Sequence, residues 1–138
     1  MGIKQISVFL ENNAGRLAEV TGVLAKAGIN LRAISIADTA DFGILRLIVN
    51  DCEGALKALN DAGFTNRQSE VAAVEIDDKP GSLAKVMDLF RERKVNIEYL
   101  YASLEGQSGK AVVIFKLENH QKGTQILKEN GISMIESF

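Results

Sequence analysis

The stretch that decides the fold is ENNAGRL (Glu11–Leu17), which returns in modified form as DDKPGSL (Asp77–Leu83). Each copy follows a run of alternating apolar residues, contains a glycine, and precedes a helical pattern. The matching positions keep a constant offset of 66 residues: Gly15 and Gly81, Leu17 and Leu83, Val20 and Val86, Leu24 and Phe90, and Asn30 and Asn96. Because one unit is encoded twice, the sequence predicts two domains, residues 1–70 and 71–138.

Within each half, the hydrophobic period changes in the order expected for βαββαβ. The first half predicts strands at 4–10, 31–37, 44–49 and 64–70, with helices starting after Gly15 and after an Asp51 cap. The second half predicts strands at 72–76, 97–104, 111–117 and 132–136, with helices at 83–93 and, behind an Asn119 cap, at 121–130. Turns rich in polar residues and glycine fall at 38–43 and 105–109.

This order predicts an α+β fold of two ferredoxin-like βαββαβ units, each an antiparallel sheet with its helices on one face. Residues 64–78 contain no proline or glycine, so we expect the two sheets to be joined side by side with four helices on one face. The predicted strands at 44–49 and 111–117 are apolar on both faces. We therefore expect a homodimer that covers the open sheet faces.

Composition limits the classes of function. The 138 residues carry a net charge of −2 with the signs evenly mixed, so no basic surface is predicted and we expect no nucleic-acid partner. Base stacking on the first and third strands would have only Phe9 and Phe115. No signal-peptide pattern or membrane-length apolar run occurs, and Cys52 is the single cysteine; these features favour a cytoplasmic protein with no membrane partner.

Catalytic and cofactor motifs are not apparent. Cys52 and His120 are the only residues of their types and take equivalent places in different halves, so we do not expect a Cys–His nucleophile pair. One histidine and one cysteine do not supply the ligands of a metal cluster. Glycine-rich phosphate and dinucleotide motifs are missing as well. The sequence predicts a protein that is not an enzyme and uses no cofactor.

The repeated motif resembles that of the ACT domain family. The carrying features are the glycine turn after the first strand of each half, and the Gly-Ile-Asn-Leu type sequence at Gly28–Leu31, matched by Lys94–Ile97. Lys94 replaces the glycine, which is a departure from the family pattern. The resemblance covers the whole chain and implies regulatory domains that sense small molecules, typically amino acids.

The resemblance also implies a ligand at the seam between neighbouring units. Carried over by position, one pocket would use Leu10, Asn12, Asn13, Gly15 and Leu17, with Asn96 across the seam. The other would use Ile76, Asp78, Gly81 and Leu83, with Asn30 across the seam.

The chemistry of these residues suits a zwitterionic amino acid. The start of the first helix offers N–H groups and a positive dipole end to a carboxylate. Asn12 and Asp78 can accept from an ammonium group, and Asn30 and Asn96 can both donate and accept. Because the first loop is uncharged, we expect the two sites to differ, with the Asn12 loop and Asn96 favoured since they leave no carboxylate desolvated.

Each candidate also has an ordinary structural explanation. The glycines are needed for the turns in any case, Asn30 and Asn96 can stabilise bends, and Asn12 and Asp78 can cap helices. The helix stripes Leu17/Val20/Leu24 and Leu83/Val86/Phe90 are predicted to be core, and Tyr99 and Tyr101 to lie in an interface or in the core.

Together these features predict a regulatory protein that binds a free amino acid or similar metabolite. With no room for a catalytic domain in 138 residues, it would act in trans, on a partner enzyme or by a change of oligomer. The alternative is a structural association module that docks on a partner enzyme and binds no ligand.

Overall fold

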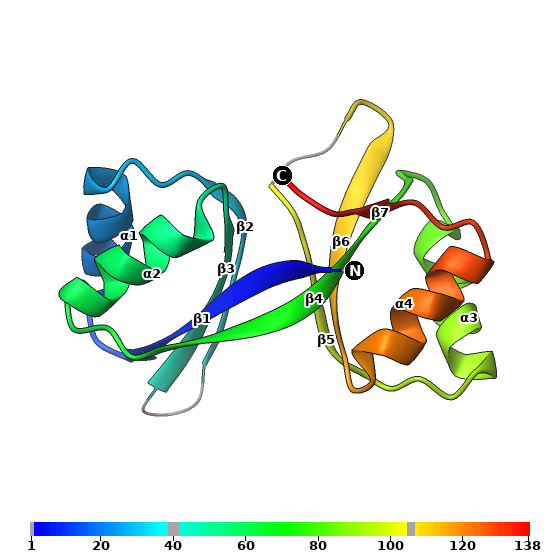
Figure 1. The fold of residues 1–138 in the computed structure, drawn as a ribbon, viewed down its shortest axis with the longest axis horizontal. Helices are drawn as coiled ribbons and strands as arrows, with labels where there is room; N and C mark the ends of the chain where they lie inside the picture. The colour runs from blue at the N-terminus through cyan, green and yellow to red at the C-terminus, as the bar shows by residue number, and fades with distance from the viewer. Residues whose placement is uncertain (1, 39–41, 105–106) are drawn as a thin grey trace. The chain divides into compact units, whose positions relative to one another are not determined.

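The computed structural model describes residues 2–38, 42–104 and 107–138 (Figure 1). The predicted turns at 38–43 and 105–109 lie partly outside these residues. The chain divides into two compact units. The first unit is Lys4–Ser69, and the second unit is Glu70–Phe138 together with the N-terminal residues up to Ile3.

The first unit has the ferredoxin-like order. Its elements are β1 (Ile3–Glu11), α1 (Arg16–Lys26), β2 (Leu31–Asp38), β3 (Phe42–Val49), α2 (Cys52–Asp61) and the beginning of β4 (Asn66–Asp77). The strands follow the order β2-β3-β1-β4, and β1 and β2 both pair with β3 in antiparallel register. This arrangement places α1 and α2 on the same face of the strands (Figure 1).

One hydrophobic core holds the first unit together. As predicted from the alternation, Ile6, Val8 and Leu10 of β1 face this core. They pack with Val20 and Leu24 of α1 and with residues of β3 and α2, all nearly inaccessible to solvent. Burial of this apolar stripe, worth about 25 cal/mol per Å², explains why a helix with this spacing forms here.

The second unit repeats the same topology. Its further elements are α3 (Ser82–Glu92), β5 (Ile97–Ala102), β6 (Lys110–Leu117), α4 (His120–Glu129) and the short β7 (Met134–Ile135). The strands follow the order β5-β6-β4-β7, and all these pairs are antiparallel. Phe90 and Phe115 pack edge to face at 5.6 Å between ring centroids in the core of this unit.

The two strands predicted at 64–70 and 72–76 are one continuous strand of 12 residues, β4. The physical reason is the lack of any breaker between Phe64 and Asp78, so the extended backbone continues through Glu70. Tyr101, predicted to lie in an interface or in the core, is buried, with its ring stacked on that of Tyr99 at 6.5 Å. Among the described residues, no helix combines the length and hydropathy needed to span a bilayer.

Candidate functional site

The two predicted loops adopt the same backbone conformation. Gly15 has φ 87° and ψ −13°, and Gly81 has φ 89° and ψ −13°. Both values lie in the left-handed region, which residues with a Cβ rarely adopt. A Cβ on either glycine would meet no atom within 4 Å. Within the chain, glycine is therefore required by the backbone conformation and not by lack of space.

Hydrogen bonds confirm that the loops match residue by residue. The N–H of Asn13 donates to the carbonyl of Glu11 at 2.8 Å, and the N–H of Lys79 donates to the carbonyl of Asp77 at 3.0 Å. The loops therefore present the side chains at positions 12 and 78 from equivalent backbone positions.

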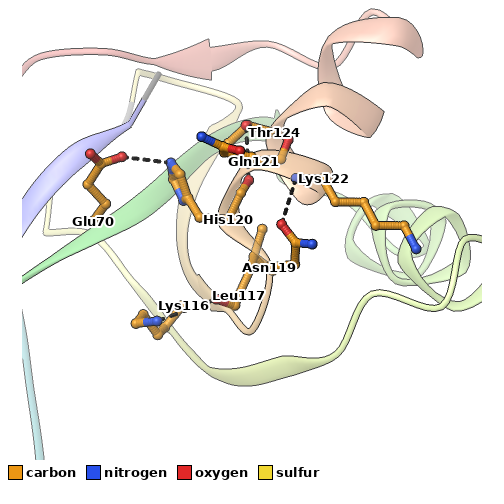
Figure 2. A network of polar contacts seen from close by, with 8 residues as sticks. All are labelled: Glu70, Lys116, Leu117, Asn119, His120, Gln121, Lys122 and Thr124. Atoms are coloured by element: carbon orange, nitrogen blue, oxygen red, sulfur yellow. Dashed lines mark hydrogen bonds and ion pairs between the residues drawn. The ribbon is translucent and has the colours of Figure 1, made fainter.

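The helices that follow these loops start without a side-chain cap. The residues before α1 and α3 are Gly15 and Gly81, and no side chain accepts a hydrogen bond from the first turn of either helix. By contrast, α2 and α4 have the caps that the sequence predicted. Asp51 accepts from the N–H of Gly54 at 3.0 Å. Asn119 accepts from the N–H of Lys122, also at 3.0 Å (Figure 2). The suggestion that Asn12 and Asp78 cap helices is therefore wrong.

Asn12 and Asp78 are exposed, and neither side chain has a hydrogen-bond partner among the described residues. Beside them, Leu17 is 42% exposed and Leu83 is 36% exposed. The prediction that these two leucines belong to the core is wrong, because the first turn of each helix projects beyond the edge of the packed stripe. Each loop thus combines free polar groups with an exposed aliphatic side chain.

Three other candidates have structural partners. The Leu10 side chain, 2% exposed, belongs to the core of the first unit. Ile76 is half-buried and packs against the core of the second unit. Asn13 Nδ2 donates to Glu11 Oε2 at 3.2 Å. The side chains of these three residues therefore contact their own unit, at the ends of β1 and β4, and are less available to a ligand.

The second loop is the more strongly charged. Asp77 accepts a hydrogen bond from Lys110, and Lys79 Nζ lies 3.8 Å from the same carboxylate. The hydrogen bond and the charge of Lys110 hold the pKa of Asp77 below its ordinary value. The negative charge of Asp77 is therefore already balanced by a lysine, whereas Asp78 has no such partner among the described residues.

Asn30 and Asn96 are exposed and lie beyond the C-terminal ends of α1 and α3. Asn30 exchanges two hydrogen bonds with Asn50, its N–H donating to Oδ1 at 2.9 Å and its carbonyl accepting from the Asn50 N–H at 3.1 Å. The carbonyl of Asn96 accepts from the N–H of Glu118 at 3.0 Å. The 11 residues of each helix correspond to about 16 Å, so neither asparagine meets the loop of its own unit. Pairing with the loop of the other unit stays a prediction.

Lys94, the departure from the family pattern, keeps the backbone shape of the glycine it replaces. Its φ is +57°, against +72° at the equivalent Gly28. In each case the next N–H, that of Val95 or of Ile29, donates to a helix carbonyl five residues earlier. The helix ends alike in both units, since the lysine tolerates the strained conformation.

One feature of the second unit has no counterpart in the sequence predictions. A groove of about 280 Å³ lies beside the second loop, and its lining includes Asp77, Lys79, Ser82, Lys85, Lys110 and Ile132. Of the predicted residues only Ile76 reaches it; Asp78, Gly81 and Leu83 do not. The residues that line the groove come from three distant parts of the chain, so no local motif could reveal it.

No group of three or more His, Cys, Asp or Glu side chains is placed to hold a metal ion in the described parts of the chain. Cys52, in the first unit, is half-buried, and burial raises the pKa of its thiol. His120 Nε2 lies 3.1 Å from Glu70 Oε2 (Figure 2).

Comparison with known proteins places the chain in a family. The model of the ACT domain pair matches residues 1–137. Protein BT0572 from Bacteroides thetaiotaomicron has a solved structure that is 44% identical, with a TM-score of 0.92 over 98% of this chain and 92% of that one. The ligand-free regulatory subunit of aspartate kinase from Thermus thermophilus is 20% identical, with a TM-score of 0.69 over 94% and 93% of the two chains, and shares the fold.

No curated protein shows significant sequence similarity to this chain. The family match nevertheless covers nearly every residue, and its paired organisation agrees with the repeated βαββαβ order. The chain belongs to the ACT domain pair family, whose domains are regulatory modules.

Proposed function

We propose that this protein is a cytoplasmic amino-acid sensor. It binds a free amino acid or a similar small metabolite at the seam between its two units and regulates an enzyme of amino-acid metabolism in trans. The observation that carries the proposal is the pair of matched, open loops. Each combines an uncapped helix start with a free polar side chain and an exposed leucine.

These three elements correspond to the three parts of an amino acid. The N–H groups at the start of α1 or α3 suit a carboxylate, because they have no side-chain cap and lie at the positive end of the helix dipole. The side-chain oxygen of Asn12 or Asp78 suits the ammonium group. Leu17 or Leu83 offers apolar contact to the ligand side chain, and closing the seam over it would remove this exposed surface from water.

We expect the Asn12 loop, completed by Asn96 of the other unit, to be the stronger site. The side chain that it offers to a ligand, Asn12, is an uncharged amide, so a ligand that contacts it does not desolvate a carboxylate at that position. The second loop carries the unpaired Asp78 and the cationic groove beside it. A ligand regulates only by binding one state of the protein better than another, and a site that forms when the seam closes meets this condition.

Thermal unfolding of the full chain against each of the twenty amino acids tests the proposal. A ligand at about 100 times its Kd adds roughly 2.7 kcal/mol of stability, which shifts the Tm of a small domain by several degrees. Asn12→Ala and Asp78→Ala form a matched pair at equivalent positions, and we expect the response to be lost with Asn12→Ala and kept with Asp78→Ala. Asn96→Ala and Asn30→Ala test the seam in the same way.

If no amino acid changes the Tm, the proposal fails. Loss of the response with Asp78→Ala alone would instead reverse the ranking of the two loops. Retention of the response in both Asn96→Ala and Asn30→Ala would place the ligand outside the seam.

A second candidate function is a ligand-free association module that docks on a second copy of the chain or on a partner enzyme. It is favoured by exposed apolar side chains on the edge strands of the two units, Ile36 on β2 (53% exposed) and Leu100 on β5 (42% exposed). Unpaired strand edges with apolar side chains are sites of pairing with another chain. Light scattering tests for a homodimer, which the strands that are apolar on both faces predict through the open sheet faces. Ile36→Lys and Leu100→Lys would dissociate only an edge-to-edge dimer.

A further inference from the structure

The groove beside the second loop differs in kind from the proposed amino-acid site. It lies within the second unit, and its volume of about 280 Å³ is near the lower end for ligand pockets. Lys79, Lys85 and Lys110 line it, together with Ser82 and the loop that leads into β7. Three lysines therefore line one small groove.

In the first unit a side chain fills this place. Arg16, the equivalent of Ser82, lies with its guanidinium 4.9 Å from the ring centroid of Phe64. Its Nη1 also donates to Glu19 Oε2 at 2.7 Å. The cation is thus held between an aromatic face and a carboxylate, both supplied by the unit itself.

Three substitutions between the repeats open this place in the second unit. Arg16 is replaced by Ser82, and Glu19 by Lys85. Phe64 is replaced by Ile132, which occupies the same turn after the last helix, since both residues donate an N–H to the carbonyl five residues earlier. Serine and isoleucine are too short to fill the space, and the carboxylate has become an ammonium group. The filled, internally paired site has become an open, cationic groove.

One of the three lysines that line the groove has no carboxylate partner among the described residues. Lys110 bonds to Asp77, and Lys79 lies near the same carboxylate. Lys85 has no ion pair with any described residue. Glu75 also lines the groove, so three lysines face two carboxylates and the lining has an excess of one positive charge. A bound anion would neutralise this excess.

We propose that the groove binds a small anion, through a carboxylate or phosphate group paired with Lys85. Lys79 and Lys110 add to the positive potential, and the Ser82 hydroxyl is placed to donate a further hydrogen bond. A volume of about 280 Å³ suits a small organic acid or a phosphate. This site does not depend on the amino-acid site proposed above, because it needs neither Asn12 nor the seam.

The test is a titration of the full-length, ¹⁵N-labelled protein with sodium phosphate and with sodium succinate, at constant ionic strength set by sodium chloride. We expect saturable amide shifts at Ser82, Lys85 and Ser133. Lys85→Gln should weaken binding about fivefold, the effect of losing one exposed charge partner. The matched control is Lys128→Gln, which removes an exposed lysine elsewhere in the same unit, and it should leave the affinity unchanged.

A triple variant, Ser82→Arg, Lys85→Glu and Ile132→Phe, transplants the filled site of the first unit and should abolish binding. Amide spectra of each variant report whether it remains folded. The anion that binds more tightly identifies the ligand group as phosphate or carboxylate. The proposal is overturned if neither anion gives saturable shifts, if Lys85→Gln binds as well as the original protein, or if Lys128→Gln weakens binding equally.

Discussion

Replacing Gly15 by alanine isolates the backbone requirement on which the candidate site depends. With φ at 87°, an alanine at this position must adopt the left-handed conformation, which costs roughly 1–2 kcal/mol for a residue with a Cβ. No atom lies within 4 Å of the added Cβ, so a steric clash contributes nothing. We therefore expect Gly15→Ala to lower the free energy of unfolding by about 1–2 kcal/mol.

Gly22 supplies the matched control within the same helix. It lies inside α1, its φ is outside the left-handed region, and a Cβ there would also meet no atom within 4 Å. Alanine in a helix interior is favoured over glycine by roughly 0.5–1 kcal/mol. The same substitution, seven residues further along the chain, should therefore stabilise the protein.

Urea unfolding followed by circular dichroism measures both variants, and thermal melts should separate their Tm values by several degrees. Gly81→Ala should reproduce the effect of Gly15→Ala, because its φ is 89°. If Gly15→Ala is neutral, or stabilises the protein as Gly22→Ala does, the left-handed turn is not the reason for the glycine and the reasoning is refuted.

Three further predictions concern other groups. Asn119→Ala removes the cap that accepts from Lys122 and should cost about 1 kcal/mol in urea unfolding; equal stability would show that the cap is not used. Lys110→Met should raise the depressed pKa of Asp77 toward its ordinary value, as measured in a ¹³C NMR titration. In the unsubstituted protein, the Asp77–Lys110 pair stabilises the fold at pH values above the ordinary pKa of the carboxyl. This stabilisation is lost as the pH falls through the depressed pKa. Because burial raises the pKa of the Cys52 thiol, the folded protein should react with iodoacetamide at pH 7 more slowly than the unfolded one, and equal rates would contradict this.

Local patterns were sufficient for the fold. The alternation of Ile6, Val8 and Leu10 and the helical spacing of Val20 and Leu24 predicted both the elements and the faces that form the first core. The caps at Asp51 and Asn119 were also correct, because an N-cap bonds only to residues two or three positions away. A continuous β4 replaced two predicted strands, since periodicity cannot distinguish a short break from uninterrupted strand.

The candidate site was only partly predictable. Gly15 and Gly81 were recognised as turns, but the exposure of Leu17 and Leu83 was not foreseen. Their spacing fits the helical stripe, and whether a residue at the end of a stripe is covered depends on how far the sheet extends beneath it. Spacing alone also left open whether Asn12 and Asp78 cap the helices.

By itself, then, the sequence determined the repeated βαββαβ order, the two cores and the positions of the loops, because these depend on interactions between near neighbours in the chain and on burial of periodic apolar residues. Tertiary structure alone decided which loop groups stay free and where the cationic groove opens. The groove is lined by residues 75–77, 79, 82, 85, 86, 110 and 131–133, which meet only after β4, β6 and α3 have packed. Side-chain volumes at Ser82 and Ile132 then leave space that Arg16 and Phe64 fill in the first unit, a difference that arises from contacts between segments distant in the chain.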